Sequence, residues 1–316
     1  MKVTGIILLL CVASTFAIRK QSVAVKGVLF CGDTPASGVS VKLWDDDDGP
    51  DPDDVMAQGR TDAQGQFTLS GDASELTNID PVLKIYHDCD DGVKPGSRKI
   101  KFKIPSSYIT SGVTAKKTFD IGKINLEIEF EGEERELLAR RFRRVPQKGK
   151  AKNKGRKQPN NQNSLFCIVC ASRVRQQAVE VRGKLMCGDI AAHGVRVKLW
   201  DEDGGPDPDD QLDQGYTDID GYFFLKGDTS EITNIDPVLK IYHDCDDGIK
   251  PGSRKIKFKI PKSYTSAGQT AEKTFDIGKI NLEIEFAGEE RELLTSRRRR
   301  VAHNSKNKPK GKGKGM

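Results

Sequence analysis

The sequence predicts an all-β protein: two antiparallel β-sandwich domains joined by a disordered basic linker. Along short segments, apolar and polar residues alternate, which is typical of strands with one buried face. The chain also repeats itself without a gap, so that Cys31 falls on Cys187, 156 positions later. Between the repeats, residues 140–157 include many basic residues and no acidic ones, which is typical of a solvated connector.

The amino terminus has the layout of a secretory signal peptide. Met1 and Lys2 precede the apolar stretch "GIILLLCVA", and small residues follow up to Ala17. We therefore assign residues 1–17 to a signal peptide cleaved after Ala17 and expect a secreted, extracellular protein. No other apolar run approaches the roughly 20 residues that span a bilayer, so we expect no membrane-spanning segment.

Six segments with period-two alternation predict the strands of the first repeat. Turn formers such as "GDTPASG", "DAQG" and "DGVKPGS" separate them. The predicted strands cover residues 23–31, 39–44, 66–69, 82–87, 99–104 and 124–130. This strand spacing favours a sandwich of about 115 residues per repeat, and we place the domains at residues 22–138 and 178–294.

The charges are segregated, although the whole chain has a formal charge of +6. Residues 22–138 contain 13 Lys and Arg against 22 Asp and Glu, whereas the last 20 residues are basic without acids. Acidic domains on an exported chain argue against a nucleic-acid partner. We expect residues 295–316 to form a disordered basic tail.

The linker, residues 139–177, contains "SLFCIVCAS", which looks like the remnant of a second signal sequence in a fused tandem gene or in two adjacent genes joined together. Its Cys167 and Cys170 have the spacing of a redox or zinc pair, but no second pair completes a zinc site, so a linker relic is favoured.

Two arginine clusters, residues 141–144 and 297–300, match the pattern that secretory convertases cleave. Cleavage after Arg144 and Arg300 would release two single domains. The competing interpretation is that the basic segments stay attached and hold the protein on heparan sulfate or on negatively charged membranes.

Both repeats resemble one known family along nearly their whole length. The order "VKGVLFC…VKLWD…TDAQGQFTLSG…IDPVLKIYHDCDDG…SRKIKFKIP" is similar to the transthyretin-like family of secreted nematode proteins. The resemblance implies a transthyretin-type sandwich, a secreted non-enzymatic role and ligands that are mostly unassigned. Some members have a further cysteine near "KPGSRK"; Gly96 and Gly252 indicate that this chain lacks it.

The motif "IYHDCDDG" occurs at residues 85–92 and again at 241–248. His87 and Cys89 point to the same face of a strand, and with Cys31 and an aspartate they could form a zinc site. Cysteines in a secreted domain are normally oxidised, however, and each repeat has two at matching positions. We therefore predict the disulfides Cys31–Cys89 and Cys187–Cys245.

A sandwich of this type also serves hydroxyisourate hydrolase, in which histidines, an arginine and a carboxy-terminal Tyr-Arg-Gly-Ser surround the substrate. Here each repeat has one matching histidine, His87 or His243, and His193 lies in a turn without a counterpart. The chain ends "KGKGKGM". A hydrolase is therefore the less favoured alternative, and we predict no enzyme activity and no cofactor.

The acidic loops "DDDDGPDPDD" and "DEDGGPDPDD" offer oxygen ligands that suit Ca²⁺, although their spacing does not fit an EF-hand. A solvated turn is the favoured interpretation. The calcium alternative would use Asp45, Asp47, Asp51 and Asp53, with Asp90 or Asp91 as further ligands, and in the second repeat Asp201, Asp203, Asp207 and Asp209.

Along "SRKIKFKIP", alternation places Lys99, Lys101 and Lys103 on one face, with Lys255, Lys257 and Lys259 in the second repeat. Three lysines on a sheet could bind an anionic lipid or a sulfated glycan. The favoured alternative is that they protect an edge strand from pairing and are neutralised by nearby carboxylates.

Together these patterns predict a secreted binding or signalling protein with an unknown small ligand or extracellular receptor. The alternative is an extracellular adaptor between an anionic surface and a receptor. The oligomeric state stays open, because a covalent tandem could satisfy a dimer surface internally.

Overall fold

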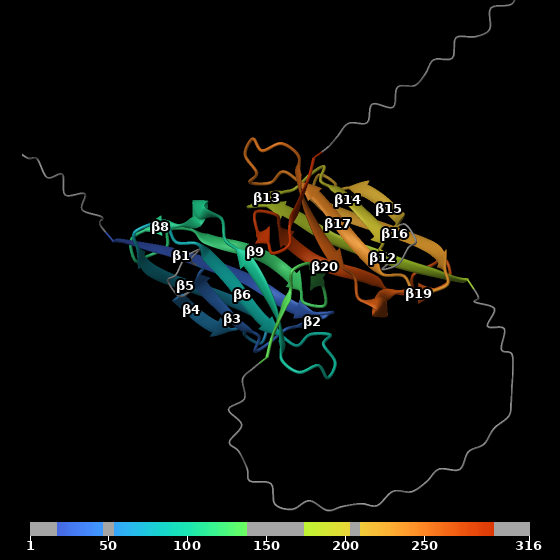
Figure 1. Ribbon diagram of the computed structural model, residues 1–316, viewed down its shortest axis with the longest axis horizontal. Helices are drawn as coiled ribbons and strands as arrows, with labels where there is room; N and C mark the ends of the chain where they lie inside the picture. Colours follow the sequence, from blue (N-terminus) through green and yellow to red (C-terminus); the bar gives the residue numbers. More distant parts are fainter. Residues whose placement is uncertain (1–17, 47–53, 138–173, 203–208, 294–316) are drawn as a thin grey trace, which may run out of the picture.

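The computed structural model describes residues 18–46, 54–137, 174–202 and 209–293, which form two β-sandwich domains (Figure 1). The predicted all-β class is confirmed. In the described ranges the chain forms no helix with the length and apolar character that a membrane crossing requires. The signal peptide, the linker and the tail predicted above lie outside these ranges, except for a few boundary residues.

The first domain contains strands β1 to β11 and one short 3-10 helix. The elements are β1 (Arg19–Cys31), β2 (Thr34–Pro35), β3 (Ser40–Asp45), β4 (Asp54–Arg60), β5 (Gln66–Glu75), β6 (Pro81–His87), β7 (Ser97–Lys103), η1 (Ser106–Tyr108), β8 (Thr110–Ser111), β9 (Thr118–Asn125), β10 (Glu129–Phe130) and β11 (Glu134–Glu136).

The second domain repeats this order. Its elements are β12 (Arg175–Cys187), β13 (Ile190–Ala191), β14 (Arg196–Asp201), β15 (Asp210–Tyr216), β16 (Tyr222–Glu231), β17 (Pro237–His243), β18 (Ser253–Lys259), η2 (Lys262–Tyr264), β19 (Ser266–Ala267), β20 (Thr274–Asn281), β21 (Glu285–Phe286) and β22 (Glu290–Glu292).

In each domain two sheets pack face to face. In the first domain, β1 lies between β5 and β9, while β3, β4, β6 and β7 form the opposite sheet. Alternation buries one face of each strand: Val25 and Leu29 on β1, and Leu43 on β3, have no exposed surface. The sandwich core is therefore built from the residues that the period-two pattern placed inside.

The predicted strands are present, with one correction, and the structure adds strands that the sequence did not predict, including the short strands β2, β8 and β11. The segment 124–130 is not one strand, because β9 ends at Asn125 and a turn precedes β10. The Asn125 side-chain oxygen accepts the N–H of Gly32 at 3.2 Å and of Glu127 at 3.1 Å, and it stabilises that turn. Strands β4 and β9 were not predicted along their lengths.

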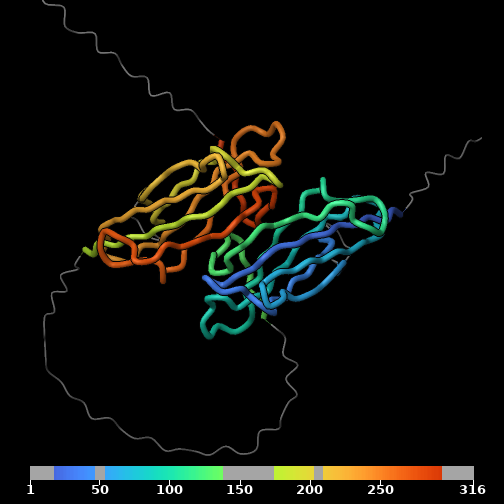
Figure 2. Tube along the Cα trace, turned by 180° about the vertical axis from the view of Figure 1, so that it is seen from behind, coloured from blue at the N-terminus to red at the C-terminus, as the bar shows by residue number. Residues whose placement is uncertain are grey.

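The two domains pair edge to edge around an approximate two-fold axis (Figures 1 and 2). Strand β9 pairs antiparallel with β20, which joins the two β1-type sheets into one ten-stranded sheet. Lys123 and Lys279 lie opposite each other at the centre of this pairing. Gly122, with a φ of +94°, permits the close approach, since a Cβ there would lie 2.0 Å from the Lys279 carbonyl oxygen.

Short strands also cross between the domains. The two-residue strand β10 of the first domain pairs with β18 of the second, and β21 of the second pairs with β7 of the first. Each domain thus supplies the edge strand that continues the other domain's second sheet. Both layers of the sandwich are therefore joined across the interface.

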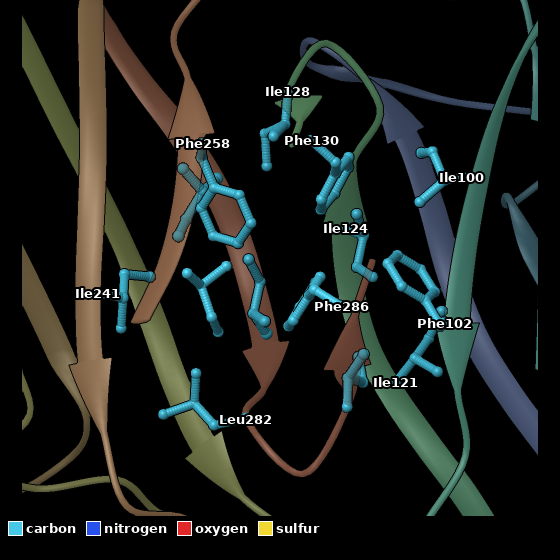
Figure 3. Close-up of a cluster of buried hydrophobic side chains, with 14 of the residues drawn as sticks. Ile100, Phe102, Ile121, Ile124, Ile128, Phe130, Ile241, Phe258, Leu282 and Phe286 are labelled. Atoms are coloured by element: carbon cyan, nitrogen blue, oxygen red, sulfur yellow. The ribbon is translucent and has the colours of Figure 1, made fainter. Parts of the chain in front are cut away.

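A cluster of four phenylalanines fills the space between the exchanged strands (Figure 3). Phe130 and Phe286 stack with ring centroids 5.9 Å apart, and Phe102 and Phe258 contact them edge to face at 5.2 to 5.6 Å. All four are at most 7% exposed. Because burying such a side chain contributes roughly 1.5–3 kcal/mol, the cluster makes the two domains share one core.

Candidate functional site

The repeated motif "IYHDCDDG" lies where β6 ends and its chain turns toward the other sheet. A disulfide joins Cys89 to Cys31 at the end of β1, with a Cα–Cα distance of 5.8 Å, and a second joins Cys187 to Cys245 at 5.7 Å. Each bridge connects the two sheets of one sandwich. The sulfurs are therefore not available as thiolate ligands for zinc.

His87 is buried beneath this turn with 4% of its surface exposed. Its Nδ1 accepts the N–H of Cys89 at 3.3 Å. Burial, and second the nearby Arg98 guanidinium, lowers the pKa of His87 to about 3. Burial and the Arg254 guanidinium lower the pKa of His243 to about 3. Both imidazoles are therefore neutral at physiological pH and shielded from solvent.

Arg98 stabilises this turn through hydrogen bonds. Its guanidinium donates to the carbonyl oxygens of Cys89 at 2.9 Å and Ile128 at 2.7 Å, and it pairs with the Glu133 carboxylate. A charged side chain this buried requires such partners, because an unpaired buried charge costs several kcal/mol. Arg254 repeats these contacts in the second domain. This arrangement fixes the turn rather than presenting a reactive group.

Asp91 also has a structural role. It forms a two-pronged ion pair with Arg135, one oxygen lying 2.7 Å from Nη1, and this contact holds the pKa of Asp91 below its usual range. Asp90, with a φ of +50°, lies beside it at the turn. Both line a hollow of about 390 Å³ together with Glu202 of the second domain. The acidic turn of one domain therefore faces the start of the other domain's acidic loop.

The calcium candidates divide between described residues and others. Asp45 is buried, and its Oδ1 accepts the Asp80 N–H at 2.7 Å, while Asp201 does the same for Asp236. Asp209 has an oxygen 4.0 Å from the Lys240 amine. The remaining candidates lie outside the described ranges: Asp47, Asp51, Asp53, Asp203 and Asp207. Among the residues described, no group of three or more His, Cys, Asp or Glu is placed to hold a metal ion.

The lysines of β7 and β18 mostly have carboxylate partners. Lys99 and Lys101 lie 3.0 and 2.7 Å from Glu134, which belongs to the neighbouring β11. In the second domain, Lys255 and Lys257 contact Glu290, and Lys257 also lies 3.6 Å from Glu131 of the first domain. The two remaining candidates stand opposite acidic residues across the interface, Lys103 opposite Glu285 and Lys259 opposite Glu129.

The interface contains hydrogen bonds between the domains that the sequence did not predict. The Tyr108 hydroxyl donates to Glu283 at 2.7 Å, and Tyr264 donates to Glu127 at 2.7 Å. Asn125 and Asn281 each donate to a backbone carbonyl of the other domain at 2.9 Å. Each contact occurs twice because the repeats present matching surfaces. Identical residues in both repeats were the available signal, but a repeat does not reveal which faces meet.

Several predicted residues lie outside the described part of the chain. They are Ala17, Arg144, Arg300, Cys167 and Cys170.

Comparison with known proteins matches each repeat to one family. A model of the transthyretin-like family matches residues 26–105 and 182–261. Transthyretin-like protein 46 of Caenorhabditis elegans is 57% identical over 149 residues, covering 45% of this chain and 83% of that protein. Transthyretin-like protein 33 of the same organism is 54% identical, covering 42% and 92%. These relatives thus correspond in length to about one repeat.

Proposed function

Because this chain belongs to the transthyretin-like family, we propose that it is a secreted, non-enzymatic binding protein whose two domains act as one unit. The interface between the two domains is the observation that supports this proposal. A continuous ten-stranded sheet and a shared phenylalanine cluster make the pair a single body, whose outer face spans both domains. Ligands commonly bind where domains meet, since residues from both can converge there.

A binding role fits the chemistry of the repeated motif better than catalysis does. A general base needs contact with its substrate and a pKa near the working pH. His87 and His243 are buried, so they do not contact a substrate. Their pKa values of about 3 lie far below the working pH, so they are poor proton acceptors near pH 7. The hydrolase alternative therefore has no support from these histidines.

The disulfides support an extracellular location. Cystine bridges persist in oxidising compartments and are rare in the cytosol. Together with the signal-like residues 1–17, they favour export.

Expression in a secretory cell line tests the proposal. We expect the protein in the medium, lacking residues 1–17, with a mass that increases by about four hydrogens on reduction of two disulfides. The same measurement reports cleavage after Arg144 or Arg300. Incubation with 5-hydroxyisourate should give no hydrolysis above buffer. Retention in the cytosol with an intact amino terminus, or measurable turnover, would overturn the proposal.

In the adaptor alternative, the lysines of β7 and β18 would bind an anionic surface. The carboxylates of Glu134 and Glu290 offset much of this charge locally, and their contacts with the lysines hold the pKa values of both carboxyls low. These strands therefore give the adaptor little support.

A further inference from the structure

An open groove of about 920 Å³ lies on the outer face of the ten-stranded sheet, at the junction of the two domains. We call it the junction groove. The first domain contributes Phe30 and Lys123, and the second contributes an aromatic wall of Tyr216, Tyr222 and Phe224. The central strands β9 and β20, green and red in Figure 2, pair with each other and contribute Lys123, Gly278 and Lys279 to its lining.

Three lysines form a row across the strands in this groove. Strand register sets Lys123 opposite Lys279, Lys279 beside Lys184, and Lys184 opposite Tyr222. Neighbouring strands lie about 4.8 Å apart, so the three lysines occupy adjacent positions on one face. Like charges directly opposite each other on a sheet are destabilising, and a bound anion would relieve that repulsion.

None of these three amines has a carboxylate within 4.0 Å among the described residues. Two of the three lie over aromatic rings: the Lys123 amine is 4.7 Å from the Phe30 ring centre, and the Lys184 amine is 4.5 Å from that of Tyr222. This is a clear difference from Lys99, Lys101, Lys255 and Lys257, which all have glutamate partners.

Three carboxylates, Asp33, Asp218 and Asp276, line the groove beside four cations, the three lysines and Arg182, so the lining has a net charge of +1 (four minus three). Asp276 accepts from Arg182 at 2.9 Å and from the Gly278 N–H at 2.8 Å. Asp218 accepts two N–H groups of its own turn, from Asp220 and Tyr222. Asp33 is the third carboxylate in the lining.

The aromatic wall exists in one domain alone. Tyr216, Tyr222 and Phe224 are 53 to 68% exposed, and the matching positions of the first domain are Arg60, Gln66 and Thr68. Lys184 likewise corresponds to Val28. The buried neighbours Phe223 and Leu225 keep their character as Phe67 and Leu69. The first domain therefore folds with polar residues at these sites, so the sandwich does not require the aromatic side chains.

We propose that the junction groove binds a sulfated polysaccharide. The lysine row would bind the sulfate groups, and the exposed rings would pack against the apolar faces of the sugar rings. The open shape and the extent across two domains fit an extended polyanion better than an enclosed small ligand. This inference rests on the proposed extracellular binding role and adds a ligand class to it.

The test uses the full chain and two probes of equal length, dextran sulfate and neutral dextran. The basic linker and tail also attract polyanions, so affinity alone does not locate the site. Two variants therefore carry residues that the first domain already has: Tyr222→Gln with Phe224→Thr, which keeps the charge, and Lys184→Val. Lys101→Gln on the opposite sheet is the control for loss of one charge, and circular dichroism checks folding.

We expect dextran sulfate to bind and neutral dextran not to bind. The double aromatic variant should weaken binding several-fold at unchanged net charge. Lys184→Val should also lower the slope of log affinity against log salt by about one, whereas Lys101→Gln should leave it unchanged.

Absence of dextran sulfate binding, or equal binding by all variants, would overturn the groove assignment. The proposed secreted role would survive that result, because it is tested by export and mass. Phosphatidylserine vesicles form a further arm. If the groove variants lose vesicle binding and keep dextran sulfate binding, the groove belongs to a lipid headgroup and the glycan assignment is wrong.

Discussion

Acidification from about pH 7.5 to about pH 5 should destabilise the protein through its two buried histidines. His87 and His243 have an ordinary pKa of 6.5 when unfolded and a pKa of about 3 when folded. The folded value is the lower one, so the unfolded state takes up protons first. Stability is therefore complete above about pH 6.5 and falls as the pH decreases from 6.5 toward 3.

The magnitude follows from the difference between the two pKa values. At about pH 5, the pH is 1.5 units below the unfolded pKa, and each unit corresponds to 1.36 kcal/mol, so one histidine costs about 2 kcal/mol. If the two domains unfold together, the two histidines lower the free energy of unfolding by about 4 kcal/mol. That is a large part of the ~5–15 kcal/mol that stabilises a typical domain.

Urea unfolding at a series of pH values measures the effect. Because the domains share a phenylalanine core, we expect one transition whose free energy changes by about 2.7 kcal/mol per pH unit below the histidine pKa, which corresponds to two protons. Independent domains would each show about 1.4 kcal/mol per unit. The range above about pH 5 is chosen because the carboxyls with lowered pKa values, such as Asp91, begin to titrate only below it.

The His87→Gln variant is the decisive control. Glutamine keeps a hydrogen-bond acceptor but does not titrate, so the pH slope should decrease by one proton. A slope that is near zero in the original chain, or that does not change in the variant, would refute the reasoning.

Three further predictions concern the disulfides and the interface. Replacing Cys31 and Cys89 by serine should cost about 4 kcal/mol on the chain-entropy model, since the bridged residues are 58 apart; an unchanged urea midpoint would contradict this. Phe286→Ala should cost about 3–5 kcal/mol and split thermal unfolding, measured by calorimetry, into two transitions, because it removes a ring that contacts three others. A single undiminished transition would show that the cluster does not couple the domains. Gly122→Ala should weaken the β9–β20 pairing, because the new Cβ would collide with the Lys279 carbonyl. Hydrogen exchange at Ile124 should therefore accelerate. Gly38→Ala is the control for loss of a glycine, because a Cβ at that position would meet no atom within 4 Å. Unchanged exchange at Ile124 would contradict the packing argument.

Sequence patterns predicted the sandwich and the disulfide pairing because these depend on local alternation and on the compartment. The pairing of the domains was not predictable in the same way. Ile124, Ile128 and Phe130 were recognised as one apolar face, yet the pattern only says that a residue is buried and not against which partner. Strands β10 and β21 have two residues each, which is too short for a periodic signal.

The junction groove had a signal that lay in the differences between the repeats. "QFTL" at residues 66–69 becomes "YFFL" at 222–225, which adds two exposed rings to a strand that needs neither. The position of Lys184 in a row with Lys123 and Lys279 could not be inferred, since it depends on strands whose paired lysines are 95 and 156 residues apart in the sequence (279 minus 184, and 279 minus 123).

Covalent linkage of the two domains has a consequence for stoichiometry. Two separate copies of one domain that paired through this interface would necessarily carry two equivalent outer faces, and every substitution would appear twice. In the tandem chain, Tyr222 and Phe224 occur on one side while Gln66 and Thr68 remain on the other. The linked pair therefore has a polarity that a homodimer lacks, and it should take up one ligand per chain in one orientation.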